Sequence, residues 1–141
     1  MDSGAVDHVM PKGQCKEIKV DETEASRKGR HYQAANGSQI KNYGERKLIG
    51  EAGKGIGSSI KMQVADVTKA LGAVTKLCDA GNRVIFDNEG SFVENKTTEI
   101  KTEIKRDNGT YTMDFWVKKS KDNMGIQAIG SSFHGPEDRD I

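Results

Sequence analysis

The sequence predicts a mainly β fold, and three features support this prediction. Sixteen glycines stand against two prolines in 141 residues, which favours a chain with many turns. The sharp turn sequences Asn36-Gly37 and Asp107-Asn108-Gly109 each join two stretches with strand character, and an Asn-Gly pair accepts positive φ at both positions. Short stretches alternate apolar and polar residues, with the period of two that a half-buried strand requires.

The first thirty residues are mostly polar. Val9 and Met10 favour a short strand that ends at Pro11, and residues 16–20 alternate enough to form another. We interpret residues 21–30 as a polar loop. Its basic end is a candidate nucleic-acid contact, but the acidic residues directly before it favour a solvated loop.

Two hairpins are predicted in the middle of the chain. The first has strands at 31–35 and 38–43, and the second has strands at 47–50 and 59–64. The glycine-rich connection at 51–58 does not fit a phosphate-binding loop, because such a loop needs Lys and then Ser or Thr directly after its last glycine. Its glycine spacing does not match the dinucleotide fingerprint either.

A short helix is predicted at about 72–80. Val67, Leu71, Val74, Leu77 and Cys78 fall on one helical face, and Gly81 follows as a stop signal. We interpret Cys78 as a small buried residue rather than a nucleophile, because no histidine lies near it in sequence.

Strands resume after the helix. Residues 84–86 and 92–93 are short apolar runs, and 100–104 alternates. The turn at 107–109 then predicts a hairpin whose second strand carries its apolar residues at 111, 113, 115 and 117. We therefore expect a core at 1–87, a β-hairpin extension at 88–117, and a polar linker or tail at 118–141.

Composition narrows the class of protein. The net charge is +1 with 30% charged residues of interleaved sign, which argues against a dedicated nucleic-acid binder. No apolar run approaches the ~20 residues of a membrane span, and no signal-peptide pattern is present. The cysteines Cys15 and Cys78 are typical of a reducing compartment, so we expect a cytoplasmic protein. The three histidines lack metal-ligand spacing, and we expect neither a metal nor another cofactor.

One stretch carries candidate chemistry. Asp2-Ser3-Gly4-Ala5 is a tight turn that presents one carboxylate with nothing bulky beside it. Two such turns facing each other would share one proton, because two close carboxylates do not both ionise easily. The ionised member then accepts a proton from water while the protonated member polarises a carbonyl. The chain contains one such turn, so this chemistry requires two chains. The alternative interpretation is an ordinary loop or a helix cap.

Taken in order, several segments resemble the protease region of a Copia-type LTR retrotransposon polyprotein, a family of retropepsin-like aspartic proteases. The resemblance covers most of the chain, from Asp2 to about Val117. The segments that carry it are 2–8, which resembles the active-site turn, 34–38, which resembles the segment after it, 71–81, which resembles the loop and helix near the end of the core, and 82–86 with 108–111.

The resemblance implies a retropepsin-like closed β-barrel or sandwich that is active as a homodimer. Asp2 would be the catalytic aspartate of each chain, Ser3 would hold the two turns together, and Gly4 would let the backbone approach the substrate. The substrate would be an extended peptide from the element's own polyprotein, held partly by main-chain hydrogen bonds.

The resemblance also implies a flap, a lid that closes over the bound peptide and excludes water. The candidate flap residues are Ala35, Asn36, Gly37 and Ser38. The glycine-rich loop at 50–57 is the alternative flap.

One departure from the family pattern concerns the start of the chain. Retropepsins have at least one strand before the active-site turn, whereas only Met1 precedes Asp2 here. We expect either a segment of a longer polyprotein or a truncated or repurposed copy. The alternative function is a catalytically inactive, protease-like β domain that acts as a binding or structural module. Neither alternative predicts a membrane or nucleic-acid partner.

Overall fold

The structure is a computed structural model that describes residues 1, 5–52, 57–107, 109–118 and 126–128. The described residues are mainly β, as predicted, with two short helices. The elements in chain order are β1 (Val9–Pro11), α1 (Glu24–Arg27), β2 (His31–Gln33), β3 (Gln39–Glu51), β4 (Gly57–Ala65), α2 (Val74–Asp79), β5 (Asn82–Ile85), β6 (Ser91–Asn95), β7 (Lys101–Asp107), β8 (Thr110–Thr112), β9 (Trp116–Lys118) and β10 (Ile126–Ala128).

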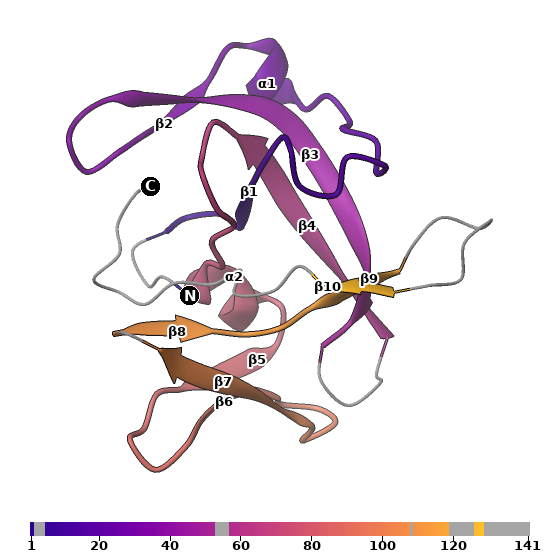
Figure 1. Ribbon diagram of the computed structural model, residues 1–141, viewed down its shortest axis with the longest axis vertical. Coiled ribbons are helices and arrows are strands. Elements are labelled where there is room, and N and C mark those ends of the chain that lie inside the picture. Colours follow the sequence, from indigo (N-terminus) through magenta and orange to yellow (C-terminus); the bar gives the residue numbers. More distant parts are fainter. Residues whose placement is uncertain (2–4, 53–56, 108, 119–125, 129–141) are drawn as a thin grey trace.

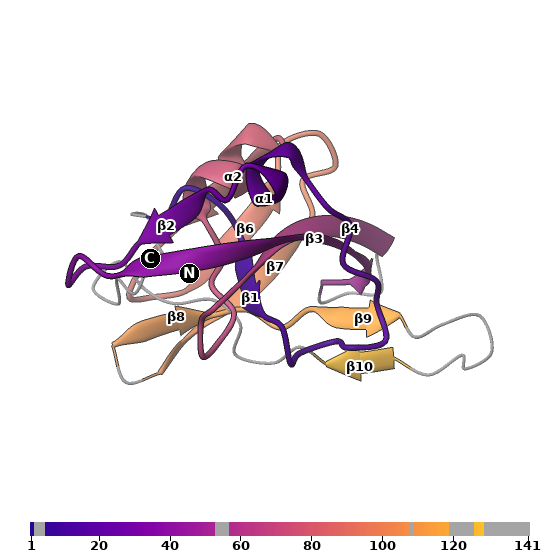
Figure 2. The ribbon, with the colours of Figure 1, turned by 90° about the horizontal axis from the view of Figure 1, so that it is seen from above.

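The strands form two sheets, one above the other in Figure 1. The six-stranded sheet has the order β1-β4-β3-β9-β10, with β2 paired to β3, and it curls like half of a barrel. The four-stranded sheet has the order β5-β6-β7-β8 and is antiparallel throughout. Seen from above, β3 runs the length of the molecule, with β2 beside one end and β9 near the other (Figure 2).

Each sheet has its own apolar core. The first core contains Leu48 from β3, Met62 and Val64 from β4, and Phe115. The second core lies between α2 and the four-stranded sheet and contains Met1, Leu77, Val93, Ile104 and Met113. The helix expected at about 72–80 is confirmed as α2, and it buries Leu77 in this second core.

The strand β3 is longer than predicted. It has 13 residues and unites the stretches 38–43 and 47–50, which we expected to be two strands. The register shifts at a bulge between Asn42 and Gly44, and the pairing with β4 continues on both sides of it. Gly44 has φ +133°, and a Cβ there would lie 2.4 Å from the carbonyl oxygen of Asp21. Only glycine therefore fits where β3 passes the segment at residue 21.

Two predictions for the first thirty residues were wrong. The loop expected at 21–30 contains the one-turn helix α1, because Thr23 and Ser26 cap each other: Thr23 Oγ1 accepts from Ser26 N at 3.1 Å, and Ser26 Oγ accepts from Thr23 N at 2.9 Å. Residues 16–20 form no strand, since Ile18 N donates to Cys15 O in a turn. Ile18 and Val20 still pack against the first core.

The predicted hairpin around 107–109 is present as β7 and β8, but the strand expected at 111–117 is interrupted. Met113 is buried in the second core, whereas Phe115 and Val117 are buried in the first. The chain therefore leaves the four-stranded sheet after β8 and joins the six-stranded sheet as β9. The alternating stretch at 111–117 therefore contributes apolar side chains to both cores.

Two strand pairings involve the predicted domain boundary and the predicted linker. Pairing of β5 with β6 crosses the position expected as the domain boundary, and β10, which lies in the stretch expected to be a linker or tail, pairs with β9. Both cysteines are free, but Cys78 is exposed, contrary to prediction, because the short α2 buries only Leu77.

In the described part of the chain, no helix is both long enough and apolar enough to cross a membrane.

Candidate active site

The residues on either side of the predicted catalytic turn are buried. Asp2, Ser3 and Gly4 themselves lie outside the described residues. Met1 and Ala5, which flank them, are 0% and 2% exposed. Met1 packs in the second core, and the Ala5 carbonyl oxygen accepts a hydrogen bond from Thr75 Oγ1 of α2 at 3.4 Å. Both flanking residues are therefore anchored in the interior.

The segment after the turn is held between two other segments. Val9 exchanges two main-chain hydrogen bonds with Leu71, of 3.0 and 2.9 Å, and pairs with Gln63 of β4 on its other side. Gln63 N also donates to the carbonyl oxygen of His8 at 2.8 Å. These bonds fix the backbone on which Asp7 and His8 are carried.

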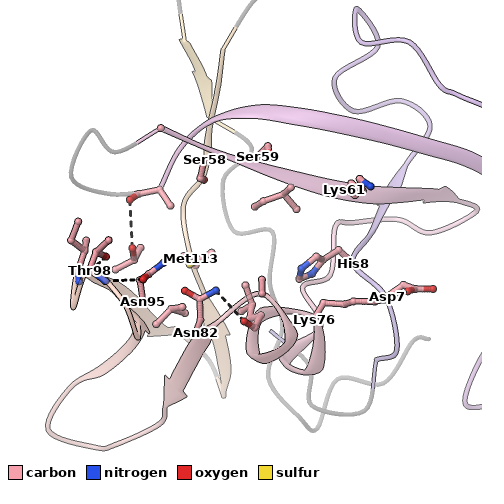
Figure 3. Close-up of a pocket in the computed structure, with 18 of the residues that line it drawn as sticks. Asp7, His8, Ser58, Ser59, Lys61, Lys76, Asn82, Asn95, Thr98 and Met113 are labelled. Atoms are coloured by element: carbon pink, nitrogen blue, oxygen red, sulfur yellow. Dashed lines mark hydrogen bonds and ion pairs between the residues drawn. The ribbon is translucent and has the colours of Figure 1, made fainter.

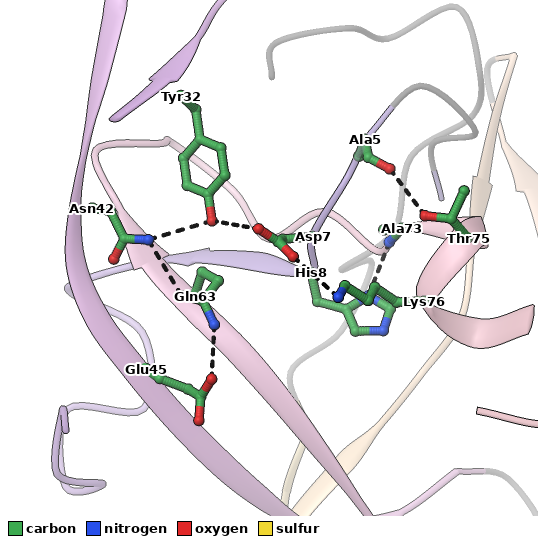
Figure 4. Close-up of polar contacts among 10 residues, drawn as sticks. All are labelled: Ala5, Asp7, His8, Tyr32, Asn42, Glu45, Gln63, Ala73, Thr75 and Lys76. Carbon is green, nitrogen blue, oxygen red and sulfur yellow. Dashed lines mark hydrogen bonds and ion pairs between the residues drawn. The ribbon is translucent and has the colours of Figure 1, made fainter. Parts of the chain in front are cut away.

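Asp7 is the centre of a polar cluster that joins three elements (Figure 4). The Tyr32 hydroxyl of β2 donates to Asp7 Oδ2 at 3.0 Å, and Lys76 Nζ of α2 lies 3.5 Å from Asp7 Oδ1. Burial, and then the negative charge of Asp7, raises the pKa of Tyr32, so the phenol remains a protonated donor. The side chain of Asp7 is 32% exposed and retains access to solvent.

Amide side chains extend this cluster along the six-stranded sheet. Asn42 Nδ2 donates to the Tyr32 hydroxyl at 3.4 Å and to Gln63 Oε1 at 3.2 Å. Gln63 Nε2 donates to Glu45 Oε2 at 2.9 Å, and Asn42 Oδ1 accepts from Gly44 N at 2.7 Å. This chain of bonds fixes the Tyr32 hydroxyl in place, since each amide has partners on both sides.

His8 is a buried base beside this cluster. It is 8% exposed, and its Nδ1 accepts a hydrogen bond from Ala73 N at 2.9 Å. Burial lowers the pKa of His8 to about 4; nearby Asp7 opposes this shift and Lys76 adds to it. The imidazole is therefore neutral at pH 7, with Nδ1 as acceptor.

The candidate flap residues form an exposed turn. Asn36 Oδ1 accepts from Ser38 N at 2.9 Å and from Ser38 Oγ at 2.7 Å, and Gly37 has φ +86°. The same hairpin carries Tyr32 on β2, and the Tyr32 hydroxyl therefore links the end of the hairpin away from the turn to Asp7 by a hydrogen bond. The structure thus connects the candidate flap hairpin to the segment that follows the predicted catalytic turn. Of the alternative flap, residues 53–56 lie outside the described residues.

A cavity of about 720 Å³ lies between β4, α2 and the four-stranded sheet (Figure 3). His8 faces it from the side of β1, whereas the Asp7 carboxylate points away from its centre. Among the described residues, no group of three or more His, Cys, Asp or Glu side chains is arranged to hold a metal ion.

Sequence reasoning missed Tyr32, Asn42 and Asp7 as site residues. A signal for Asn42 was present in β3, where the even positions from 40 to 50 are all buried. Had β3 been recognised as one strand, Asn42 would have appeared as a polar residue at a core position, which indicates a hydrogen-bonded network. No protein-family model, curated protein or solved structure was found to match this chain.

Proposed function

We propose that this chain is a retropepsin-like aspartic endopeptidase of a retrotransposon polyprotein. It cleaves extended peptides by attack of a water molecule that an Asp2 dyad, formed in a homodimer, activates. The observation that carries the proposal is the hydrogen bond from Tyr32 to Asp7, because it joins the candidate flap hairpin to the segment directly after the candidate catalytic turn.

Further contacts support the same arrangement. Catalysis by a carboxylate pair requires each carboxylate to be held in a fixed position by its surroundings. Ala5 is bonded to Thr75, and Val9 is bonded to Leu71. Both partners, Thr75 and Leu71, lie in 71–81, the stretch that resembles the loop and helix near the end of the retropepsin core. Segments far apart in sequence, each of which the resemblance singles out, thus contact one another in space.

The proposed mechanism assigns a role to each part. The two Asp2 carboxylates share one proton; the ionised one accepts a proton from water, and the protonated one polarises the scissile carbonyl. Ser3 holds the two turns together across the dimer, and Gly4 gives the peptide backbone room to approach. The hairpin turn at Ala35–Ser38 closes over the peptide and excludes bulk water. No metal and no covalent intermediate takes part in these steps.

The direct test is the substitution Asp2→Asn. We expect the wild-type chain to cleave a Gag–Pol-type peptide at mildly acidic pH, and Asp2→Asn to abolish cleavage without changing the melting temperature. Asp79→Asn is the matched control, since it also removes one carboxylate but lies on an exposed part of α2. Cleavage that survives Asp2→Asn would exclude the proposal.

Sedimentation distinguishes the peptidase from the alternative binding module. A peptidase that needs two chains loses specific activity on dilution, in parallel with the loss of the dimer. A strict monomer at high concentration, whose thermal stability does not respond to pepstatin-type inhibitors, would instead favour the non-catalytic module.

A further inference from the structure

The strand β4 has one edge that is only partly paired. On one side, β4 pairs with β3 along its whole length, from Gly57 to Ala65. On the other side, β1 pairs only with Gln63, Val64 and Ala65. Among the described residues, no strand therefore continues the line of β1 along residues 57–62.

The hydrogen bonds of Gln63 show which main-chain groups occupy this edge. Gln63 N donates to His8 O at 2.8 Å, so the main chain of Gln63 faces β1. The N–H and C=O groups of a strand point to alternate sides along the chain. Lys61 and Ser59 therefore present their N–H and C=O groups to the same side as Gln63, whereas Ile60 and Met62 face β3. Unpaired groups of this kind are a template for an added strand.

The cavity described above lies along this edge (Figure 3). Ser58, Ser59 and Lys61 line it from β4, and the lining residues Leu77 and Val93 come from α2 and β6, which lie across the cavity from β4. The edge at 57–62 is about 20 Å long at the usual rise of a strand. A volume of about 720 Å³ is in the range that holds a small ligand or a short peptide.

We propose that the edge of β4 at residues 57–61 binds a single extended peptide strand from a partner, in line with β1. Its main chain pairs with Lys61 and Ser59, and its apolar side chains alternate toward the wall formed by Leu77, Val93 and Met113. The cavity is bounded by α2 and the four-stranded sheet, so it accommodates one strand rather than the sheet of a second copy. The inference is independent of the proposed peptidase activity, because it uses the main chain of β4 and not Asp2.

Amide hydrogen exchange tests the edge in the free protein. The amides of Lys61 and Ser59 should exchange quickly, and those of Ile60 and Met62 slowly, because only the second pair faces β3. Slow exchange at both Lys61 and Ser59 in the free protein would overturn the proposal, since these groups would already have partners.

The binding test uses a capped seven-residue peptide of alternating valine and threonine. At saturation, exchange at Lys61 and Ser59 should slow by more than about tenfold, with little change at Ile60 and Met62. Two control peptides carry N-methyl groups on one or the other alternate set of amides. One of them should bind and the other should not, because only one set of peptide N–H groups faces β4. Equal binding of the two controls, or no protection of Lys61 and Ser59 at millimolar peptide, would overturn the proposal.

A pair of proline variants provides a second test of peptide binding at the β4 edge. Ser59→Pro removes an N–H from the unpaired edge and should weaken peptide binding by more than about tenfold while the fold persists. Ile60→Pro is the matched control: it removes an N–H that faces β3 and should lower the melting temperature of the free protein. Undiminished peptide binding by a folded Ser59→Pro variant would contradict the proposal.

Discussion

Arg46 lies on β3 and Asp7 lies just before β1, so both charged side chains belong to the region of the six-stranded sheet. They differ in the kind of group that they contact. Arg46 is 4% exposed and donates to four main-chain carbonyl oxygens: Ile18 at 2.9 Å, Gln14 at 2.8 Å, Lys12 at 3.1 Å and Pro11 at 3.4 Å. Asp7 instead contacts the side chains Tyr32 and Lys76, which belong to two different elements.

The difference separates a structural role from a functional one. The carbonyls around Arg46 belong to Pro11, the last residue of β1, and to the loop that follows it, so the guanidinium fixes the path of that loop beside β3. Desolvation lowers the pKa of Arg46 without discharging it at neutral pH, because an arginine begins so high. Asp7 keeps solvent access and connects β2 and α2 to the segment that follows the candidate catalytic turn in sequence. Substituting Arg46 should therefore affect mainly stability, and substituting the partners of Asp7 should affect mainly activity.

The largest effect is expected for Arg46→Met. The substitution leaves the carbonyls of Ile18, Gln14 and Lys12 without their donor in a site closed to water, and we expect the free energy of unfolding to fall by about 3–5 kcal/mol. Urea denaturation measures the change. Lys47→Met is the matched control because Lys47 is the exposed neighbour on the same strand, and it should change stability by less than about 0.5 kcal/mol. A loss below about 1 kcal/mol for Arg46→Met would refute the structural role.

The buried His8 is a structural group whose contribution to the free energy of unfolding depends on pH. Its pKa is lowered to about 4 in the folded chain, so the unfolded chain binds more protons between pH 6.5 and 4. Stability is therefore complete above about pH 6.5 and declines as the pH falls, by on the order of 3 kcal/mol at pH 4 and below. Protonation of Nδ1 also removes the acceptor for Ala73 N, next to the start of α2.

The control for this pH dependence is His8→Asn, which keeps an acceptor but does not titrate. Denaturation midpoints at pH 7, 5.5 and 4.5 should decline for the wild-type chain and decline less for His8→Asn. Parallel curves for the two proteins would show that other groups cause the decline. The result also bears on the proposed peptidase, because mildly acidic conditions favour a shared carboxylate proton but weaken this fold.

Local sequence signals predicted the turns and the helix, and long-range packing decided the rest. The turn at Asn36-Gly37 and the helix α2 depend on residues adjacent in sequence, and both are present where we expected a turn and a helix. The need for glycine at position 44 of β3 comes from Asp21, which lies against it, a contact that no local pattern contains. The alternation of Met113 and Phe115 was recognised, but not that the two residues enter different cores.

The residues of the candidate site also fall into those that a local motif predicted and those that depend on contacts between distant segments. The sequence alone indicated the carboxylate turn and the flap hairpin, because each is a short motif. It did not place Tyr32 beside Asp7, since that contact spans 25 residues and depends on β2 joining the edge of β3. Asn42 became recognisable only once β3 was known to be one strand with a buried face.

The smallest effect on stability, and the most informative one, is expected for Tyr32→Phe. The loss of one partly exposed hydrogen bond to Asp7 should lower the free energy of unfolding by about 1 kcal/mol. If the bond positions the flap hairpin over the catalytic turn, kcat/KM for peptide cleavage should fall by roughly fivefold to tenfold, beyond what the small loss of folded protein explains.

The chain contains a matched control for Tyr32→Phe. Tyr43 also donates to a carboxylate, that of Asp66, with distances of 2.8 and 2.9 Å, but Asp66 follows the far end of β4 rather than the catalytic turn. Tyr43→Phe should leave kcat/KM unchanged, because its carboxylate is not in the segment after Asp2. A double-mutant cycle with Asp7→Asn then isolates the contact, since Tyr32→Phe should have no further effect on kcat/KM in that background. If Tyr32→Phe and Tyr43→Phe reduce cleavage equally, the contact with Asp7 has no special place in catalysis, and Asp7 belongs with Arg46 among the structural groups.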